Sequence, residues 1–229
     1  ACAKFIARHL YNFFVADEPQ VPAWDIEPPQ DAEAVQFLAD VFVESSFEIK
    51  PVLRALFNSD FFKESAYQKV RNPVEIVAST LKLTGDIVGP DPRLEDISAE
   101  PGYMGQDMLD PPSVEGWHTG KEWINSGSLV KRINFVADRV GNVELPGIQD
   151  IVRRVAGEDK AMTAEVLIDR CLDHMGPLEL TERSHKELLD QVETEGPISY
   201  DTEKSYAAFA QRVGSTLALI ASTREYQFG

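Results

Sequence analysis

Hydrophobic residues recur every three or four positions along most of the chain, which is the spacing of one face of an α-helix. Nine segments have this spacing: residues 5–14, 31–42, 49–57, 72–85, 128–136, 148–155, 163–171, 188–192 and 201–220. Strict alternation of apolar and polar residues, which would indicate a half-buried strand, is nowhere long enough to demand a sheet. The pattern therefore predicts an all-α fold, an irregular multi-helix bundle.

Local signals mark where several of these helices begin. Asn72, Pro73 and Glu75 combine a capping side chain, a proline at the first helical position and a glutamate that reaches back to the cap, and Gly85 can end the same helix. Four further residues are expected to cap helices: Asp31, Ser113, Ser128 and Thr163.

The first helix has a distinct apolar side. Its members are Phe5, Ile6, Leu10, Phe13 and Phe14. We expect this face to be buried, with His9 one turn away, partly buried and hydrogen-bonded to a loop carbonyl. A proline-rich connector over residues 19–29 ends the helix.

Residues 105–127 interrupt the helical pattern. This segment holds Trp117, Trp123, a Pro111-Pro112 pair and four glycines. A long irregular segment inside a domain is usually functional or disordered, and aromatic content argues against disorder. We predict a long ordered loop and, with it, the surface of greatest functional interest.

A cluster of glycine and proline near residues 141–147 suggests a boundary between two parts of the fold. We expect a helical core with the long central loop over residues 1–140 and a C-terminal helical subdomain over residues 141–229 packed on it, or one continuous domain.

Charge narrows the classes of partner. The 229 residues include 22 Lys and Arg against 38 Asp and Glu, a formal net charge of −16. Such a charge repels phosphate backbones and anionic lipid surfaces, so no nucleic-acid partner is expected. No window approaches 18 uninterrupted apolar residues, so no transmembrane segment is expected either.

The ends and the cysteines add little about location. The sequence opens without Met inside a helical pattern and without a signal peptide, so we infer that the true N-terminus is missing. Cys2 and Cys171 fall at apolar helical positions. We expect buried free thiols, although the two could pair.

Candidate chemistry concentrates in and after the loop. His118, with Asp107, Asp110, Glu115 and Glu122 near it in sequence, could be a general base or a metal ligand. A surface imidazole is the favoured reading, because no second His stands at a metal spacing, and we predict no metal and no cofactor. Arg132 could clamp Asp110 or bind a substrate oxyanion. The weak catalytic candidates are thus His118, Asp110 and Arg132.

The two tryptophans suggest binding or packing. Trp117 and Trp123 could form an aromatic platform for a sugar or a peptide, with Asn125 beside them, or they could fix the loop to the helical core. We favour packing and predict that at least one of the two rings is mostly buried. Asn125 is then a local capping residue.

Several catalytic motifs are missing from the sequence. It contains no G-x-x-x-x-G-K-S/T loop, no G-x-S-x-G elbow, no H-E-x-x-H and no C-x-x-C-H. The acidic stretch over residues 86–96 lacks the ligand spacing of a calcium loop.

The order of several motifs resembles the domain-of-unknown-function 1800 family. The matching segments are FIARHLYNFFV at 5–15, VLRALFNSDFF at 52–62, KVRNPVE at 69–75, DPPSVEGW at 110–117, WINS at 123–126, RINF at 132–135 and LALIASTREYQF at 217–228. The resemblance implies the C-terminal half of a large, mostly helical bacterial protein, often exported, with no established activity. It implies a periplasmic or extracellular location and a protein or envelope partner.

The sequence is compatible with three functions, each from a different class of protein. We favour a helical scaffold or interaction module. The alternatives are a hydrolase that acts on an envelope polymer with its site at residues 105–127, and a carbohydrate- or peptide-binding module that uses Trp117 and Trp123.

Overall fold

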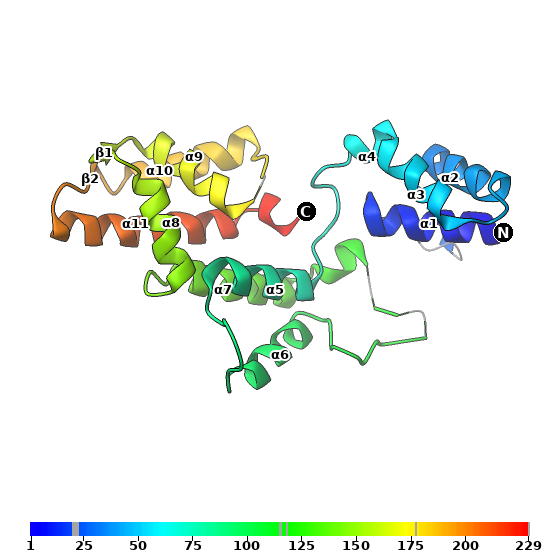
Figure 1. Cartoon of the computed structure of the whole chain (residues 1–229), viewed down its shortest axis with the longest axis horizontal. Coiled ribbons are helices and arrows are strands. Elements are labelled where there is room, and N and C mark those ends of the chain that lie inside the picture. Colours follow the sequence, from blue (N-terminus) through cyan, green and yellow to red (C-terminus); the bar gives the residue numbers. More distant parts are fainter. Residues whose placement is uncertain (20–22, 115, 118, 177, 229) are drawn as a thin grey trace. The chain divides into compact units, whose positions relative to one another are not determined.

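The computed structural model describes residues 1–19, 23–114, 116–117, 119–176 and 178–228. Across these residues the fold is mainly helical, with one small antiparallel pair of strands (Figure 1). The all-α prediction is confirmed.

The chain divides into two compact units, and each is described by itself. Unit 1 comprises Ala1–Val70, Thr119–Lys121 and Phe228–Gly229, and unit 2 comprises Arg71–His118 and Glu122–Gln227. Each unit has its own cluster of buried apolar residues. Val136 and Val140 share the unit 2 cluster with Ile148 and Ile151. The division expected between residues 140 and 141 stays a prediction.

In its described residues, unit 1 contains the α-helices α1 (Cys2–Phe14), α2 (Ala32–Glu44), α3 (Ile49–Asn58) and the short α4 (Asp60–Lys63). Helix α1 packs along α2, and α2 packs on α3. The centre of the core is formed by Ala7, Leu38, Val52 and Leu56, each fully buried. Asp31 begins α2 as predicted, since its carboxylate accepts the Ala34 N–H.

The buried side of α1 differs from the prediction. Phe5 and Phe13 are exposed, and the fully or nearly buried positions are Ala7, Arg8, Tyr11 and Asn12. His9 is also exposed and lies edge-on to Phe5, with ring centroids 4.4 Å apart. The expected apolar face is therefore only partly in the core: Ile6, Leu10 and Phe14 are partly buried and pack against it, whereas Phe5 and Phe13 are exposed.

The connector after α1 explains this difference. Its backbone needs hydrogen-bond partners, and the polar residues of α1 supply them. Arg8 donates through Nε to the Pro19 carbonyl at 3.0 Å and through Nη2 to the Glu18 carbonyl, while Asn12 accepts the Glu18 N–H at 2.9 Å. The side of α1 that carries these polar groups is turned inward as a result.

Unit 2 contains the remaining elements. In order these are α5 (Pro73–Thr84), α6 (Leu94–Tyr103), the end of the 3-10 helix η2 (Gly120–Trp123), α7 (Ser126–Val140), α8 (Pro146–Ala156), β1 (Ala161–Met162), α9 (Ala164–Met175), α10 (Glu182–Glu193), β2 (Ile198–Ser199), α11 (Glu203–Ala221) and η3 (Glu225–Gln227). Helix α11 is central, because it packs on α7, α8, α9 and α10. Ala161 pairs with Ser199 and Met162 with Ile198.

Capping predictions are partly confirmed in unit 2. Asn72 and Glu75 form the expected reciprocal box on α5, Gly85 ends that helix at φ +62°, and Thr163 caps α9. Two predictions are wrong. Helix α7 begins earlier, with Asn125 as its cap and Ser128 inside its first turn. Ser113 begins no helix among the described residues and instead forms an isolated bridge with Gly116.

Both cysteines are free thiols. Burial raises the pKa of the Cys171 thiol to about 12, as expected for an inert core residue. Cys2 is exposed, because it lies at the start of α1 outside the helix packing, so its expected burial is wrong. Among the described residues, no helix combines the length and apolarity needed to cross a membrane.

Candidate functional site

The segment over residues 105–127 is anchored at several points. Met104 is buried just before it, and the Gln106 side chain accepts the Val74 N–H at 3.0 Å at the start of α5. Residues 107–114, which follow these anchors, are exposed. Leu109 is 93% exposed at φ +67°, and the N–H of Asp110 closes the turn by donating to the Asp107 carbonyl at 3.3 Å.

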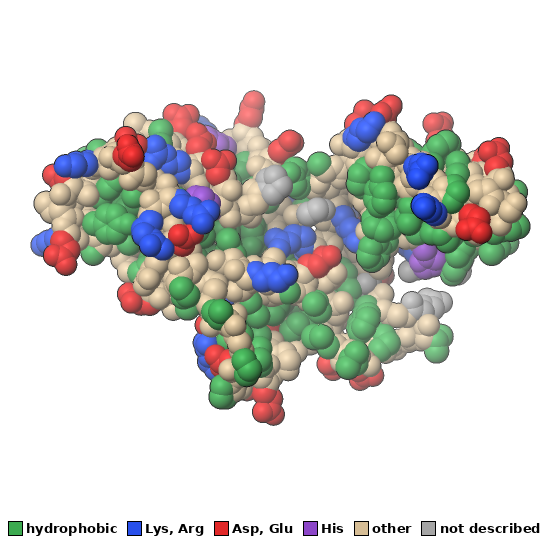
Figure 2. Space-filling view, viewed as in Figure 1, with side chains coloured by type: hydrophobic (Ala, Val, Ile, Leu, Met, Phe, Trp, Pro, Cys, Tyr) green, Lys and Arg blue, Asp and Glu red, His purple; other side chains and the backbone are tan. Residues whose placement is uncertain are grey.

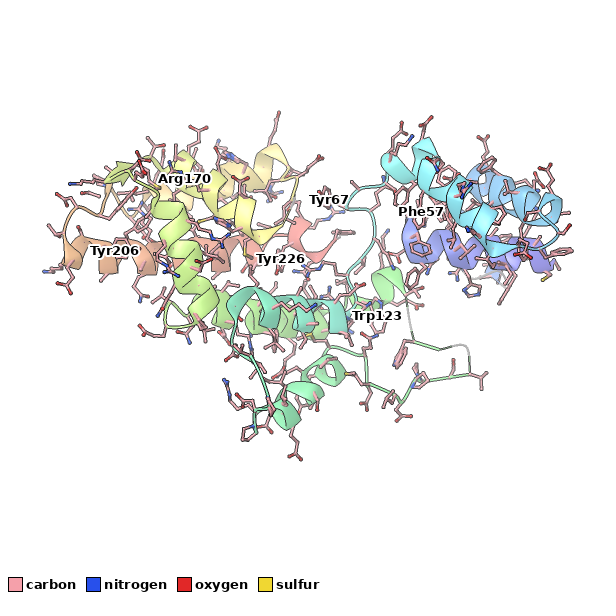
Figure 3. All side chains as sticks on the ribbon, viewed as in Figure 1. Phe57, Tyr67, Trp123, Arg170, Tyr206 and Tyr226 are labelled. Atoms are coloured by element: carbon pink, nitrogen blue, oxygen red, sulfur yellow. The ribbon has the colours of Figure 1, made fainter. Side chains whose placement is uncertain are left out.

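The two tryptophans have different environments. Trp123 is 5% exposed at the end of η2, so the prediction that at least one ring is mostly buried is confirmed (Figure 3). Trp117 is half-buried, and its Nε1 donates to the Asp107 carbonyl at 3.0 Å. Both rings thus help to shape the loop. A ligand-binding role for Trp117, Trp123 and Asn125 stays a prediction.

Asn125 connects the loop to α7. Its side-chain oxygen accepts the N–H groups of Gly127 and Ser128, each at 3.0 Å. The Ser128 hydroxyl accepts the Asn125 N–H at 3.0 Å and donates to the Trp123 carbonyl at 2.8 Å. This reciprocal cap holds the backbone of Trp123 against the first turn of α7.

Arg132 is fully buried, and its partners differ from the expected ones. Its Nε donates to Gln227 Oε1 at 2.9 Å and its Nη2 to the Arg71 carbonyl at 2.6 Å. Asp110 is exposed, and the expected clamp between the two residues is absent from the described contacts. Burial, with the charge of Arg71, lowers the pKa of Arg132 to about 10, against the opposing effect of Glu75.

The expected acid–base cluster is only partly described. His118 and Glu115 lie outside the described residues, so a general-base role for His118 stays a prediction, as do the catalytic roles of Asp110 and Arg132. Within the described residues, no group of three or more His, Cys, Asp or Glu side chains could hold a metal ion.

Unit 1 carries a surface that sequence reasoning missed. Phe13 touches Phe14, Phe14 touches Phe57, and Phe57 touches Phe62, with ring centroids 4.7, 5.1 and 5.2 Å apart. Phe13 is 66% exposed and Phe57 is 41% exposed. We call these four residues the aromatic ladder. Figure 2 shows hydrophobic side chains gathered on the visible side of unit 1, and Figure 3 labels Phe57 on α3.

The exposure of the aromatic ladder follows from how α1 is oriented in unit 1. Edge-to-face contacts hold the exposed rings of Phe13 and Phe57 against Phe14 and Phe62, which are partly buried on the unit 1 core. The run of Phe13, Phe14, Phe57 and Phe62 was visible in the sequence, but helical spacing alone assigns such residues to a core. The inward turn of Arg8 and Asn12 decides otherwise.

Comparison with models of protein families identifies the family of this chain. The model of a family described as "Protein of unknown function (DUF1800)" matches residues 1–228, a range that includes every residue described above. The chain belongs to the DUF1800 family. No curated protein and no solved structure matches it.

The motifs that suggested the family have structural roles in this DUF1800 chain. Asn72 and Glu75 cap α5, Asn125 caps α7, and Arg132 ties α7 to the carbonyl of Arg71 and to the side chain of Gln227. Much of the motif pattern therefore specifies how the ends of helices in unit 2 are held.

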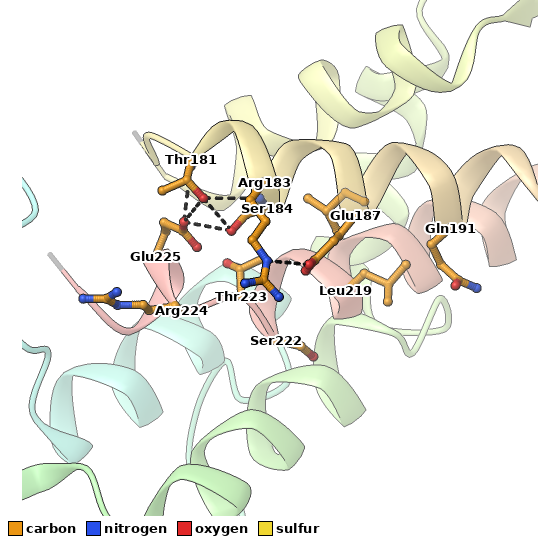
Figure 4. Close-up of a pocket in the computed structure, with 11 residues that line it drawn as sticks. Thr181, Arg183, Ser184, Glu187, Gln191, Leu219, Ser222, Thr223, Arg224 and Glu225 are labelled. Atoms are coloured by element: carbon orange, nitrogen blue, oxygen red, sulfur yellow. Dashed lines mark hydrogen bonds and ion pairs between the residues drawn. The ribbon is translucent and has the colours of Figure 1, made fainter.

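A hollow of the DUF1800 chain lies between α10 and the end of α11 (Figure 4). It encloses about 670 Å³ above Leu188 and Leu219. Glu225 Oε1 accepts hydrogen bonds from the Thr181 N–H at 3.2 Å and from the hydroxyls of Thr181 and Ser184, each at 2.9 Å. These bonds to Oε1 fasten the start of α10 to the C-terminal segment, while Glu225 Oε2 is buried without a hydrogen-bond partner among the described residues.

Glu225 makes the stability of unit 2 depend on pH. Burial raises the pKa of its carboxyl, but hydrogen bonds from its own backbone, Ser184 and Thr181 outweigh burial and hold that pKa below the ordinary value. The stabilisation is therefore complete above the pKa of the unfolded chain and is lost as pH falls through the folded pKa. Glu225→Gln should cost about 1–2 kcal/mol at pH 7 and less near pH 3.

Urea unfolding of both proteins between pH 3 and pH 7 measures this difference. Glu187→Gln is the control, because Glu187 lies in the same hollow and its ion pair, with Arg183 at 2.8 Å, is exposed. A Glu225→Gln effect that does not shrink at low pH would contradict the assignment.

Proposed function

We propose that this chain is a helical scaffold or interaction module and that the aromatic ladder is its binding surface for a partner protein. The main support for this proposal is that Phe13 and Phe57 are exposed to solvent and are held in place by edge-to-face contacts with Phe14. Large exposed apolar patches in water mark interaction sites, and aromatic residues dominate the binding energy of interfaces.

Contacts in and near residues 105–127 favour a structural role for this loop over a catalytic one. Trp123 and Arg132 are buried, and Asn125 is occupied in capping α7. These three candidate site residues therefore contribute to the packing and capping of unit 2. The hydrolase and the carbohydrate- or peptide-binding alternatives remain open, through His118, Asp110 and Arg132 for the first and through Trp117, Trp123 and Asn125 for the second.

Site-specific photo-crosslinking tests the proposal. Benzoylphenylalanine in place of Phe13 should give a discrete protein adduct in cells of the source organism. The same group in place of Tyr103, a 63% exposed aromatic residue of unit 2, is the matched control and should not give that adduct. The adduct should disappear when Phe57→Ser is added.

The expected loss has a physical basis. Phe57 contacts both Phe14 and Phe62, so its removal breaks the middle of the ladder without opening the core. Truncating a central aromatic residue of an interface costs about 2 kcal/mol or more. Identical adducts from positions 13 and 103, or none from position 13, would contradict a partner-binding ladder.

A further inference from the structure

Charges in unit 1 are segregated by helix. Helices α1 and α3 contain Lys4, Arg8, Lys50 and Arg54 and no acidic residue, although the whole chain has 38 Asp and Glu against 22 Lys and Arg. Helix α2 has the opposite composition, with Glu33, Asp40 and Glu44 and no basic residue. The helices that provide Phe13 and Phe57 are thus the basic ones in an acidic protein.

The basic side chains of α3 are available. Lys50 and Arg54 are exposed, and neither makes an ion pair among the described residues. With Pro51, Ala55 and Asn58 they line a shallow groove of about 580 Å³ along α3. Arg8 is different, because it is buried and bound to the connector carbonyls.

This groove is continuous with the aromatic ladder. Arg54 lies three residues before Phe57 on α3, and residues three apart are neighbours on a helix surface. At the other end of the ladder, Lys69 Nζ lies 5.1 Å from the centroid of the Phe13 ring. Acidic side chains lie near the edges: Glu48 precedes α3, and Asp60 is paired with Lys63 at 3.4 Å.

We infer that the ladder and the α3 groove together bind an acidic amphipathic segment of a partner protein, with its apolar side chains on Phe13 and Phe57 and its carboxylates at Lys50 and Arg54. This inference rests on the proposed function and specifies the partner. Apolar anchors beside a row of opposite charges are the usual means of recognising an amphipathic helix. Complementary charge at the rim sets specificity and the rate of encounter.

The net charge of the chain favours a peptide over other anionic occupants. A membrane surface extends beyond unit 1 and is repelled by a protein of charge −16, and so is a second copy of the chain. A short segment meets mainly the local surface, since charges farther away than about 8 Å are screened at physiological salt.

Fluorescence anisotropy with the 229-residue chain tests the inference. The probe is a labelled synthetic helix of about 18 residues, with Leu at positions i, i+3, i+4 and i+7 and Glu elsewhere. We expect it to bind, to bind more weakly as salt is raised from physiological levels, and to lose at least about tenfold in affinity with K50E/R54E. The same helix with Lys in place of Glu should not bind.

The control variant is K186E/K204E. Lys186 and Lys204 are exposed on α10 and α11 of unit 2, and the variant changes the net charge of the chain by the same amount. It should retain the wild-type affinity. Glu at position 50 is compatible with folding, because an acidic residue in the first turn of a helix is favourable.

Several outcomes would overturn the inference. They are equal losses in the two charge variants, equal binding of the Lys helix, or no binding of the Glu helix. Cosedimentation with phosphatidylglycerol vesicles in the absence of peptide binding would assign the surface to lipid instead. An adduct at position 13 without Glu-helix binding would leave the proposed function standing and reject only this partner chemistry, whereas no adduct at all would reject the proposed function.

Discussion

Replacement of Gly147 by alanine is expected to destabilise unit 2 by about 3 kcal/mol. A Cβ at this position would lie 2.1 Å from the Leu83 carbonyl oxygen and 2.6 Å from the Thr84 carbonyl carbon. Both are backbone atoms at the end of α5, so neither can move aside as a side chain can. The start of α8 would have to separate from α5, and their shared apolar contacts would weaken.

The matched control is Gly89→Ala, because a Cβ there meets nothing within 4 Å and the backbone is not left-handed. That variant should be neutral, or stabilising by up to about 1 kcal/mol through a less flexible unfolded chain. Chemical denaturation followed by circular dichroism measures both variants. Equal stabilities would show that α5 and α8 are not in the close contact described.

The second large effect is expected in unit 1. Leu38 is fully buried at the centre of α2, facing the packing between α1 and α2. Leu38→Ala removes apolar contacts and leaves a cavity that rigid helices fill only partly. Its cost should be about 3 kcal/mol, within the usual range for such substitutions.

Hydrogen exchange followed by mass spectrometry shows where this destabilisation occurs. The apolar residues around Leu38 all lie in unit 1. Amides of α1, α2 and α3 should therefore exchange faster in Leu38→Ala, while those of α9 and α11 stay protected. Val43→Ala is the control, since Val43 lies on the same helix but is 53% exposed. Faster exchange throughout unit 2 would show that the two cores are energetically coupled.

Leu38→Ala also bears on function. The ladder joins α1 to α3 through the contact of Phe14 with Phe57, and both helices are held by α2. Loosening α2 should weaken partner binding even though Leu38 itself is inaccessible. A variant that is destabilised but binds as well as the wild type would show that the ladder does not need this packing.

Helix existence was largely predictable, and helix faces were not. The periodic segments became helices because burying an apolar stripe drives helix formation wherever the 3.6-residue spacing is kept. Helix α6 was missed, because Leu94–Tyr103 has few apolar residues and contains Pro101. The buried side of α1 was assigned only in part, because Phe5 and Phe13 are exposed. The periodicity shows that an apolar stripe exists but not which polar groups the connector requires inside.

In the candidate site, too, the sequence predicted local features but not contacts between distant segments. That one tryptophan of the loop would be buried followed from its composition, but the partners of Arg132 did not. Gln227 is 95 residues away in sequence and the Arg71 carbonyl 61, and no local pattern reports such pairs. The nearby acid, Asp110, was the natural expectation from sequence, and it lies in solvent.

The sequence by itself determined the helical class, most capping sites and the family, because these depend on spacing and on residues close together in the chain. Only the tertiary structure decided that the chain has two cores, that Arg132 is buried on neutral acceptors, and that aromatic and basic side chains of α1 and α3 share one surface. These features arise where distant segments compete for burial and for hydrogen-bond partners. That competition is settled by the packing of the whole unit.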